Sequence, residues 1–218
     1  MAGRHRNPTT VRIGRFLIAL LTAVVVVAVG GAVSSTELRP EEKFRPFIIT
    51  GELGEWFASR TFDLRVVGVR VAATIQPELE PELDTAGAWV VVRVQLMAQR
   101  EAVFLDYARV WDSLGRSWEA TERTDQPLID GSQRLDPRIP VEGEIAFEVP
   151  RDAVTDLRLR LGSQTGGLYG LQMATLAEVP LAIDEAAVAS GLAATEPVVI
   201  APPEIVIAET QILNGVER

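Results

Sequence analysis

The chain has 218 residues, a formal net charge of −9, one histidine and no cysteine. The absence of cysteine excludes disulfides and thiol nucleophiles. The one histidine, His5, lies near the N-terminus, so the rest of the chain has no imidazole for catalysis or metal binding. The acidic balance excludes electrostatic binding of nucleic acid, and no nucleotide-binding motif is present. We therefore expect neither a cofactor nor an enzyme.

The N-terminal part of the sequence predicts a membrane anchor. Residues 16–33 read FLIALLTAVVVVAVGGAV and carry no charge. As a helix this segment spans roughly 27 Å, which is enough to cross the core of a bilayer. Four arginines precede it and the first acids follow it, so residues 1–15 are expected to be a cytoplasmic arm. The chain after the anchor is then extracytoplasmic, at the plasma membrane.

A cleaved secretory signal is the alternative interpretation of the same segment. Its start is basic, its centre is apolar, and Gly30 and Ala32 fit a small-x-small cleavage pattern. The apolar run is longer than the usual core of a signal peptide, which favours a retained anchor. If cleavage occurs, the protein is instead a secreted, antigen-like domain.

The remaining sequence divides into three parts. Residues 34–46 are charged, contain Pro40 and lack periodicity, which predicts a stalk. Residues 47–163 contain short alternating apolar stretches separated by turn signals, which predict an antiparallel sandwich or barrel. Residues 164–218 are expected to form a C-terminal extension with additional strand(s). Arginine strongly outnumbers lysine, with Lys43 alone, which indicates GC-rich coding and an actinobacterial source.

The clearest strand is predicted at residues 88–98, where Trp89 is expected to be a core residue. Residues 60–75 also alternate, but the parity of the pattern changes after Val66, which predicts a bulge near Gly68. Residues 76–87 contain two prolines and four acids and are predicted to be a loop. Further strands are predicted at residues 141–149, 156–162 and 168–183, and a helical turn at residues 184–194.

Several stretches carry a family resemblance: RTFDLRVVGVRV at residues 60–71, GAWVVVRVQL at 87–96, WDSLGRSWEAT at 111–121, RIPVEGEIAFEVP at 138–150, and DLRLRLG at 156–162. Together they resemble the DUF4352-type domains of Gram-positive bacteria and the related telokin-like secreted antigens of mycobacteria. The resemblance implies an all-β, immunoglobulin-like antiparallel β-sandwich, here preceded by one N-terminal transmembrane helix. It implies binding or accessory roles rather than catalysis. The C-terminal extension departs from the family pattern.

Two sets of side chains are candidates for binding sites. The densest acidic run is a calcium candidate, since calcium takes six to eight oxygen ligands, but its prolines and the lack of DxDxDG spacing favour a solvated loop. Two large aromatic side chains that flank a predicted turn and two arginines that alternate with leucines suggest a surface for a ligand or partner, against the alternatives of cross-strand packing and a solvated sheet face. The calcium candidates are Glu78, Glu80, Glu82 and Asp84, and the ligand or partner candidates are Trp111, Trp118, Arg158 and Arg160.

These features together predict a non-catalytic accessory or protein-interaction module of a bacterial cell-envelope system. Its expected partners are the lipid bilayer, through residues 16–33, and another cell-envelope or membrane protein. One alternative is a domain that binds an envelope glycan or lipid, and another is a calcium-dependent adhesion domain.

Overall fold

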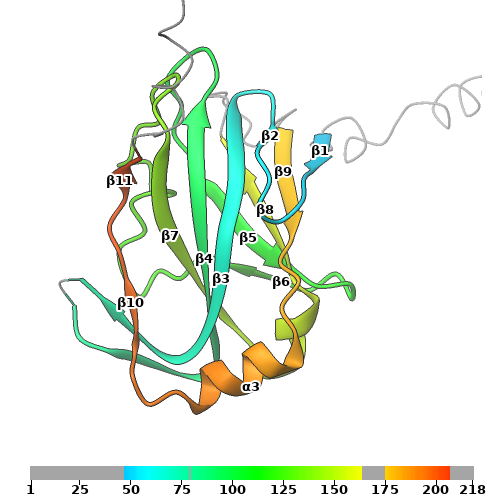
Figure 1. Ribbon diagram of the computed structural model, residues 1–218, viewed down its shortest axis with the longest axis vertical. Helices are drawn as coiled ribbons and strands as arrows, with labels where there is room; N and C mark the ends of the chain where they lie inside the picture. The colour runs from blue at the N-terminus through cyan, green and yellow to red at the C-terminus, as the bar shows by residue number, and fades with distance from the viewer. Residues whose placement is uncertain (1–46, 79, 164–174, 207–218) are drawn as a thin grey trace, which may run out of the picture. The chain divides into compact units, whose positions relative to one another are not determined.

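The structure is a computed structural model that describes residues 47–78, 80–163 and 175–206. These residues form a mostly antiparallel β-sandwich of two sheets, which confirms the predicted all-β class (Figure 1). Sheet A contains, in order across the sheet, β1 (Phe47–Thr50), β9 (Thr175–Pro180), β8 (Arg158–Gly162), β5 (Tyr107–Trp111) and β6 (Ser117–Glu119). Sheet B contains β10 (Val198–Ile200), β3 (Phe62–Pro77), β4 (Leu83–Ala98), β7 (Val141–Val149) and β11 (Glu204–Ile205), and the short β2 (Phe57–Ala58) also pairs with β3.

The hydrophobic core lies between the two sheets and is filled by alternate residues of their strands. Val90, Val92 and Val94 of β4 are fully buried there, as are Leu159 and Leu161 of β8. Successive side chains of a strand point to opposite faces, so the alternation in the sequence directly selects which residues enter the core. The strands predicted at residues 141–149 and 156–162 are confirmed as β7 and β8.

The long hairpin of β3 and β4 contains the predicted bulge. The register between the two strands shifts between Val66 and Gly68, so Val67 is the extra residue and is partly exposed. An extra residue moves the following side chains to the opposite parity, and this is why Val66 and Val69 both face the core.

Most of the loop predicted at residues 76–87 is strand instead. β3 continues to Pro77 and β4 begins at Leu83. Contacts between the two strands extend the hairpin, and the amino-acid composition of residues 76–87 gives no sign of them. The hydroxyl of Thr74 donates to Asp84 Oδ1 at 2.7 Å, and Trp89 Nε1 donates to the carbonyl oxygen of Leu83 at 2.9 Å.

A second, smaller hydrophobic cluster lies on the outer face of sheet B. Trp89 and Val91 of β4 point to this face, opposite to the main core, and pack with Ile75 and Ala146. Ile200 of β10 completes the cluster. Trp89 is therefore fully buried, as predicted, but in a cluster that the C-terminal strand β10 helps to close.

Strands from the C-terminal part of the chain belong to both sheets. β9 lies between β1 and β8, β10 pairs in parallel with β3, and β11 pairs antiparallel with β7. The pair of β1 and β9 is also parallel. Parallel neighbours need long connections, and both parallel pairs join strands that are far apart in the sequence.

Helix α3 (Glu185–Ala193) begins after Asp184, whose carboxylate accepts a hydrogen bond from the backbone N–H of Ala187 at 2.6 Å. An aspartate in this position satisfies one of the free N–H groups of the first turn. Val188 and Leu192 pack against the main core, so the predicted helical turn at residues 184–194 is confirmed. Gly191 lies so close to β3 that a Cβ atom would meet the carbonyl oxygen of Val71 at 2.1 Å.

The predicted arm, anchor and stalk, residues 1–46, lie outside the described residues, and these assignments stay predictions. Among the residues that are described, no helix is long and apolar enough to cross a bilayer.

We expect Gly191→Ala to lower the free energy of unfolding by about 1–3 kcal/mol, because α3 must move away from β3 to admit the methyl group. In an open helix the same substitution would stabilise by up to about 1 kcal/mol. Gly68→Ala is the matched control, since a Cβ atom there meets nothing within 4 Å. Urea unfolding of the two variants measures the difference, and equal effects would contradict the close contact.

Candidate functional site

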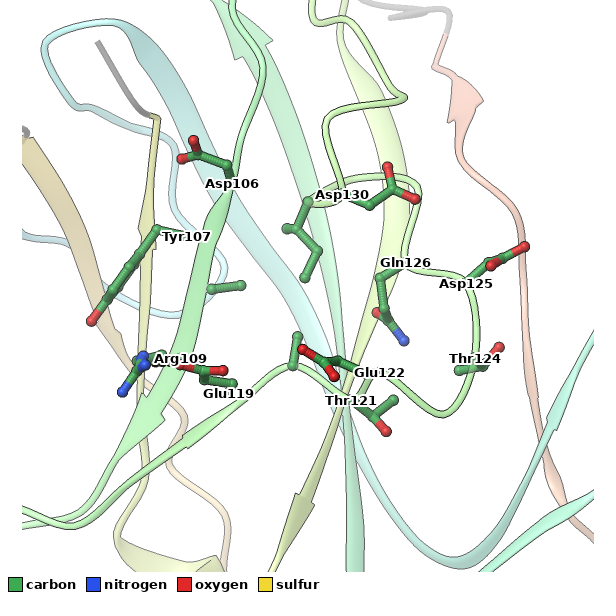
Figure 2. A pocket seen from close by; sticks show the side chains of 13 residues that line it. Asp106, Tyr107, Arg109, Glu119, Thr121, Glu122, Thr124, Asp125, Gln126 and Asp130 are labelled. Atoms are coloured by element: carbon green, nitrogen blue, oxygen red, sulfur yellow. Dashed lines mark ion pairs between the residues drawn. The ribbon is translucent and has the colours of Figure 1, made fainter. Parts of the chain in front are cut away.

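A cavity of about 460 Å³ opens beside β5, between this strand and the connection 120–130 (Figure 2). We call it the β5 cavity. It lies where β6 has separated from β5, because the pairing of these strands covers only residues 109–111 and 117–119. Its charged lining contains one base, Arg109, and several acids. The acids are Asp106, Glu119, Glu122, Asp125 and Asp130.

Some of these charges are already paired. Arg109 forms an ion pair with Glu119, and Asp130 Oδ1 accepts a hydrogen bond from the N–H of Ser132 at 2.7 Å. No described residue forms an ion pair with the carboxylates of Glu122 or Asp125. The cavity is therefore electronegative and suits a cationic or hydroxyl-rich ligand better than an anion.

Gln126 fixes the connection to sheet B. Its side chain is buried, and its Oε1 accepts a hydrogen bond from the backbone N–H of Ala146 at 3.2 Å. No described residue bonds to its Nε2 atom. The bond to Ala146 is thus the contact through which this side chain ties the cavity wall to sheet B.

The outer face of sheet A adjoins the cavity and gathers three of the predicted partner residues. The guanidinium of Arg160 lies over the ring of Trp111, 4.7 Å from its centroid. Arg160 Nε also donates to Glu178 Oε2 at 2.6 Å, and Arg158 reaches the other oxygen of Glu178 at 3.3 Å. Arg109 lies over the ring of Tyr107 in the same way, at 5.8 Å. We call Tyr107, Arg109, Trp111, Arg158 and Arg160 the outer face.

Trp118 does not belong to this surface. It pairs with Val110 across β5 and β6 and packs against the main core, whereas Trp111 pairs with Ser117 and faces outward. The two tryptophans therefore lie on opposite sides of sheet A and do not form an exposed aromatic pair. Neighbouring residues of a strand point to opposite sides of the sheet. Trp118 directly follows Ser117, the cross-strand partner of Trp111, so its side chain points to the side opposite Trp111.

Glu178 is the residue that sequence reasoning missed. It is buried, with 5% of its surface exposed, and it binds both arginines of β8. A charge buried in a sheet is stable only when it is paired and hydrogen-bonded. The available signal was one acid in the apolar run 175–181, TLAEVPL, but its partners lie on another strand.

The predicted calcium residues are not gathered into a site. Glu80 accepts hydrogen bonds from Thr124 Oγ1 at 3.2 Å and from the N–H of Asp125 at 3.4 Å, while Asp84 accepts one from Thr74. Within the described part of the chain, no group of three or more acidic side chains is placed to hold a metal ion. Calcium binding by Glu78, Glu80, Glu82 and Asp84 stays a prediction.

Two carboxylates with lowered pKa values bind the β5–β6 turn: Asp112 lies within it, and Asp156 reaches it from the 3-10 helix Arg151–Asp156 that precedes β8. Burial opposes ionisation of Asp112, but hydrogen bonds from the backbone and side chain of Arg116, at 2.8 and 2.6 Å, bring its pKa below the ordinary 3.8. Hydrogen bonding from Ser113, whose backbone N–H lies 3.0 Å from Asp156 Oδ2, lowers the pKa of Asp156. These bonds stabilise the turn next to Trp111.

Comparison with known proteins finds structural neighbours but no family. No family model matches the chain, and no curated protein matches it. An uncharacterized β-sandwich protein from Clostridium difficile aligns with a TM-score of 0.39 and 13% identity, over 66% of this chain and 99% of its own. The yjhA protein from Bacillus subtilis aligns with a TM-score of 0.44 and 13% identity, over 59% of this chain and 98% of its own.

MPT63, a secreted protein from Mycobacterium tuberculosis, aligns with a TM-score of 0.42 and 14% identity, over 60% of this chain and 98% of its own. At this level of similarity we draw no functional argument from these structures.

We expect the free energy of unfolding to decrease as the pH falls from about 5 to about 3. A carboxylate whose pKa is lowered by folding stabilises the protein above its unfolded pKa of about 3.9, and this stabilisation disappears as the pH falls through the folded value. Asp112→Asn should reduce the slope, which urea unfolding at a series of pH values measures. Identical slopes for the variant and the natural chain would contradict the shift.

The two tryptophans Trp89 and Trp111 provide a second prediction. Trp89 Nε1 is bonded to Leu83, whereas no described residue bonds to the buried Nε1 of Trp111. We expect Trp89→Phe to lower the free energy of unfolding by about 1–3 kcal/mol more than Trp111→Phe does, because only the first leaves a carbonyl without its donor. Thermal unfolding of both variants tests this, and an equal or larger cost at Trp111 would contradict it.

Proposed function

We propose that this protein is a non-catalytic accessory module that binds another protein of a bacterial cell envelope. In this proposal residues 16–33 anchor it in the plasma membrane, and an immunoglobulin-like sandwich of the DUF4352 or telokin-like type presents the binding surface on the extracytoplasmic side. The observation that supports it is the outer face of sheet A. Tyrosine, tryptophan and arginine, which make up this surface, are the residue types that contribute most to protein interfaces.

The construction of the outer face supports this use. Glu178 holds Arg158 and Arg160, and the rings of Trp111 and Tyr107 lie beneath Arg160 and Arg109. Side chains that are already ordered lose little conformational entropy when a partner binds. Arg158 and Arg160 retain exposed surface that a partner can cover, with 51% and 23% of their side chains exposed.

A second candidate function is binding of an envelope glycan, and the β5 cavity favours it. The cavity has the volume of a small-molecule site, and its wall carries the carboxylates of Glu122 and Asp125, with which no described residue forms an ion pair. Carboxylates accept hydrogen bonds from the hydroxyl or amino groups of a sugar.

The test is capture of the partner from native membranes by the full chain. We expect Arg158→Ala to reduce the recovery of a protein partner about tenfold or more, since central arginines of interfaces cost at least that when truncated. Arg134→Ala is the matched control, because Arg134 is exposed and ion-paired with Asp136 but belongs to no strand of sheet A. Capture that depends equally on both arginines, or a chain that stays monomeric in mild detergents, would contradict the proposal. Recovery of a glycan instead would support the second candidate.

A further inference from the structure

Five large apolar side chains are exposed along one edge of the sandwich. Phe47 and Ile48 belong to β1, Leu53 and Trp56 to the connection 51–56, and Val67 is the bulge residue of β3. Between 39% and 57% of each is exposed. We call this surface the β1 edge. The other exposed apolar side chains of the described residues are distributed singly over loops and over β10 and β11, which is normal for a protein surface.

The topology explains why the segments that carry these five side chains lie at one edge, where Phe47 and Ile48, as neighbours in β1, point to opposite sides of sheet A. β1 is the outermost strand of sheet A, and β2 lies outside β3, so the connection 51–56 runs along the side of the sandwich (Figure 1). The N–H of Gly54 donates to the carbonyl oxygen of Val66 at 2.9 Å, and Arg65 Nε donates to the carbonyl oxygen of Gly54 at 2.8 Å. These bonds hold the connection beside the bulge, so the apolar surface is ordered.

The sequence indicates what covers this edge. The chain enters the sandwich at Phe47, and only thirteen residues, 34–46, separate it from the predicted anchor. Even fully extended they reach about 45 Å, so in the anchored location proposed above Phe47 lies within that distance of the bilayer. Tryptophan is enriched where proteins meet the lipid headgroups, and Trp56 lies within this edge.

We propose that the β1 edge docks on the outer leaflet of the bilayer and inserts its apolar side chains among the headgroups and upper acyl chains. This proposal rests on the anchored location proposed above and adds a fixed orientation. With the β1 edge on lipid, β6 and the β5 cavity face away from the membrane, because β1 and β6 are opposite edges of sheet A. The outer face of sheet A then remains accessible to a partner protein.

The charges beside the β1 edge select the lipid. Glu52 and Glu55 are exposed in the same connection and outnumber the one base bound to it, Arg65, so an anionic surface repels the connection. Docking should therefore be stronger on zwitterionic phosphatidylcholine vesicles than on vesicles containing phosphatidylglycerol.

The absence of cysteine from the chain allows a direct test. Leu53→Cys and the control Leu114→Cys each give one thiol for a spin label in the full chain, reconstituted into phosphatidylcholine vesicles. Leu114 is an exposed leucine of the turn beside β6, at the opposite edge of sheet A. We expect the label at 53 to collide more often with oxygen, which concentrates in lipid, than with a water-soluble nickel chelate. The label at 114 should show the opposite order.

The outcomes separate this proposal from the anchored location. If an alkaline carbonate wash removes the chain from the vesicles, the anchored location itself is wrong. If the chain is retained but labels at 53 and at Ile48→Cys are both as accessible to nickel as the label at 114, docking is overturned and the anchor stands. Strong coupling between labels at 53 of two chains would overturn it too, since the β1 edge would then be covered by a second copy.

Discussion

Strand β4 has apolar side chains on both faces, and this constraint organises the rest of the molecule. Its even-numbered valines fill the core between the sheets, so sheet A must cover them. Trp89 and Val91 point the other way and need a second cover, which β10 helps to provide through Ile200. A strand buried on both faces occupies the centre of its sheet, and β3 and β7 accordingly flank it. The ion pairs of Glu142 with Arg93 and of Glu144 with Arg70 cover the remainder of this side of sheet B.

Sequence patterns correctly predicted the structural features that depend on only a few neighbouring residues. The bulge at Val67 was visible because a change of parity is written within a few positions, and the helix after Asp184 was predicted as a helical turn at residues 184–194. The strand ends in residues 76–87 were missed because prolines and acids there indicated a loop. Pairing of β3 with β4, and the bond from Trp89 to Leu83, outweigh that local preference.

The candidate site was predicted less well, since it depends on contacts between distant residues. Arg158 and Arg160 were identified from alternation along β8, but their partner Glu178 comes from β9, which no spacing rule connects to them. Trp111 and Trp118 were paired in the sequence because both flank a turn, and strand geometry separates them. The β5 cavity had no signal at all, because it arises where β6 leaves β5 and the connection 120–130 returns toward β7.

The position of β9 inside sheet A has a consequence for how the molecule is made. Among the described strands β1 pairs with β9 alone, so it stays unpaired until residues 175–180 have been synthesised. One edge of β8 is also open until β9 pairs with it. Contacts between such distant parts of a chain close late, because a long loop must be ordered before they form. Sheet A therefore cannot be completed while residues 175–180 are still inside the ribosome. Until they emerge, β1 has none of the described strands beside it and one edge of β8 stays open.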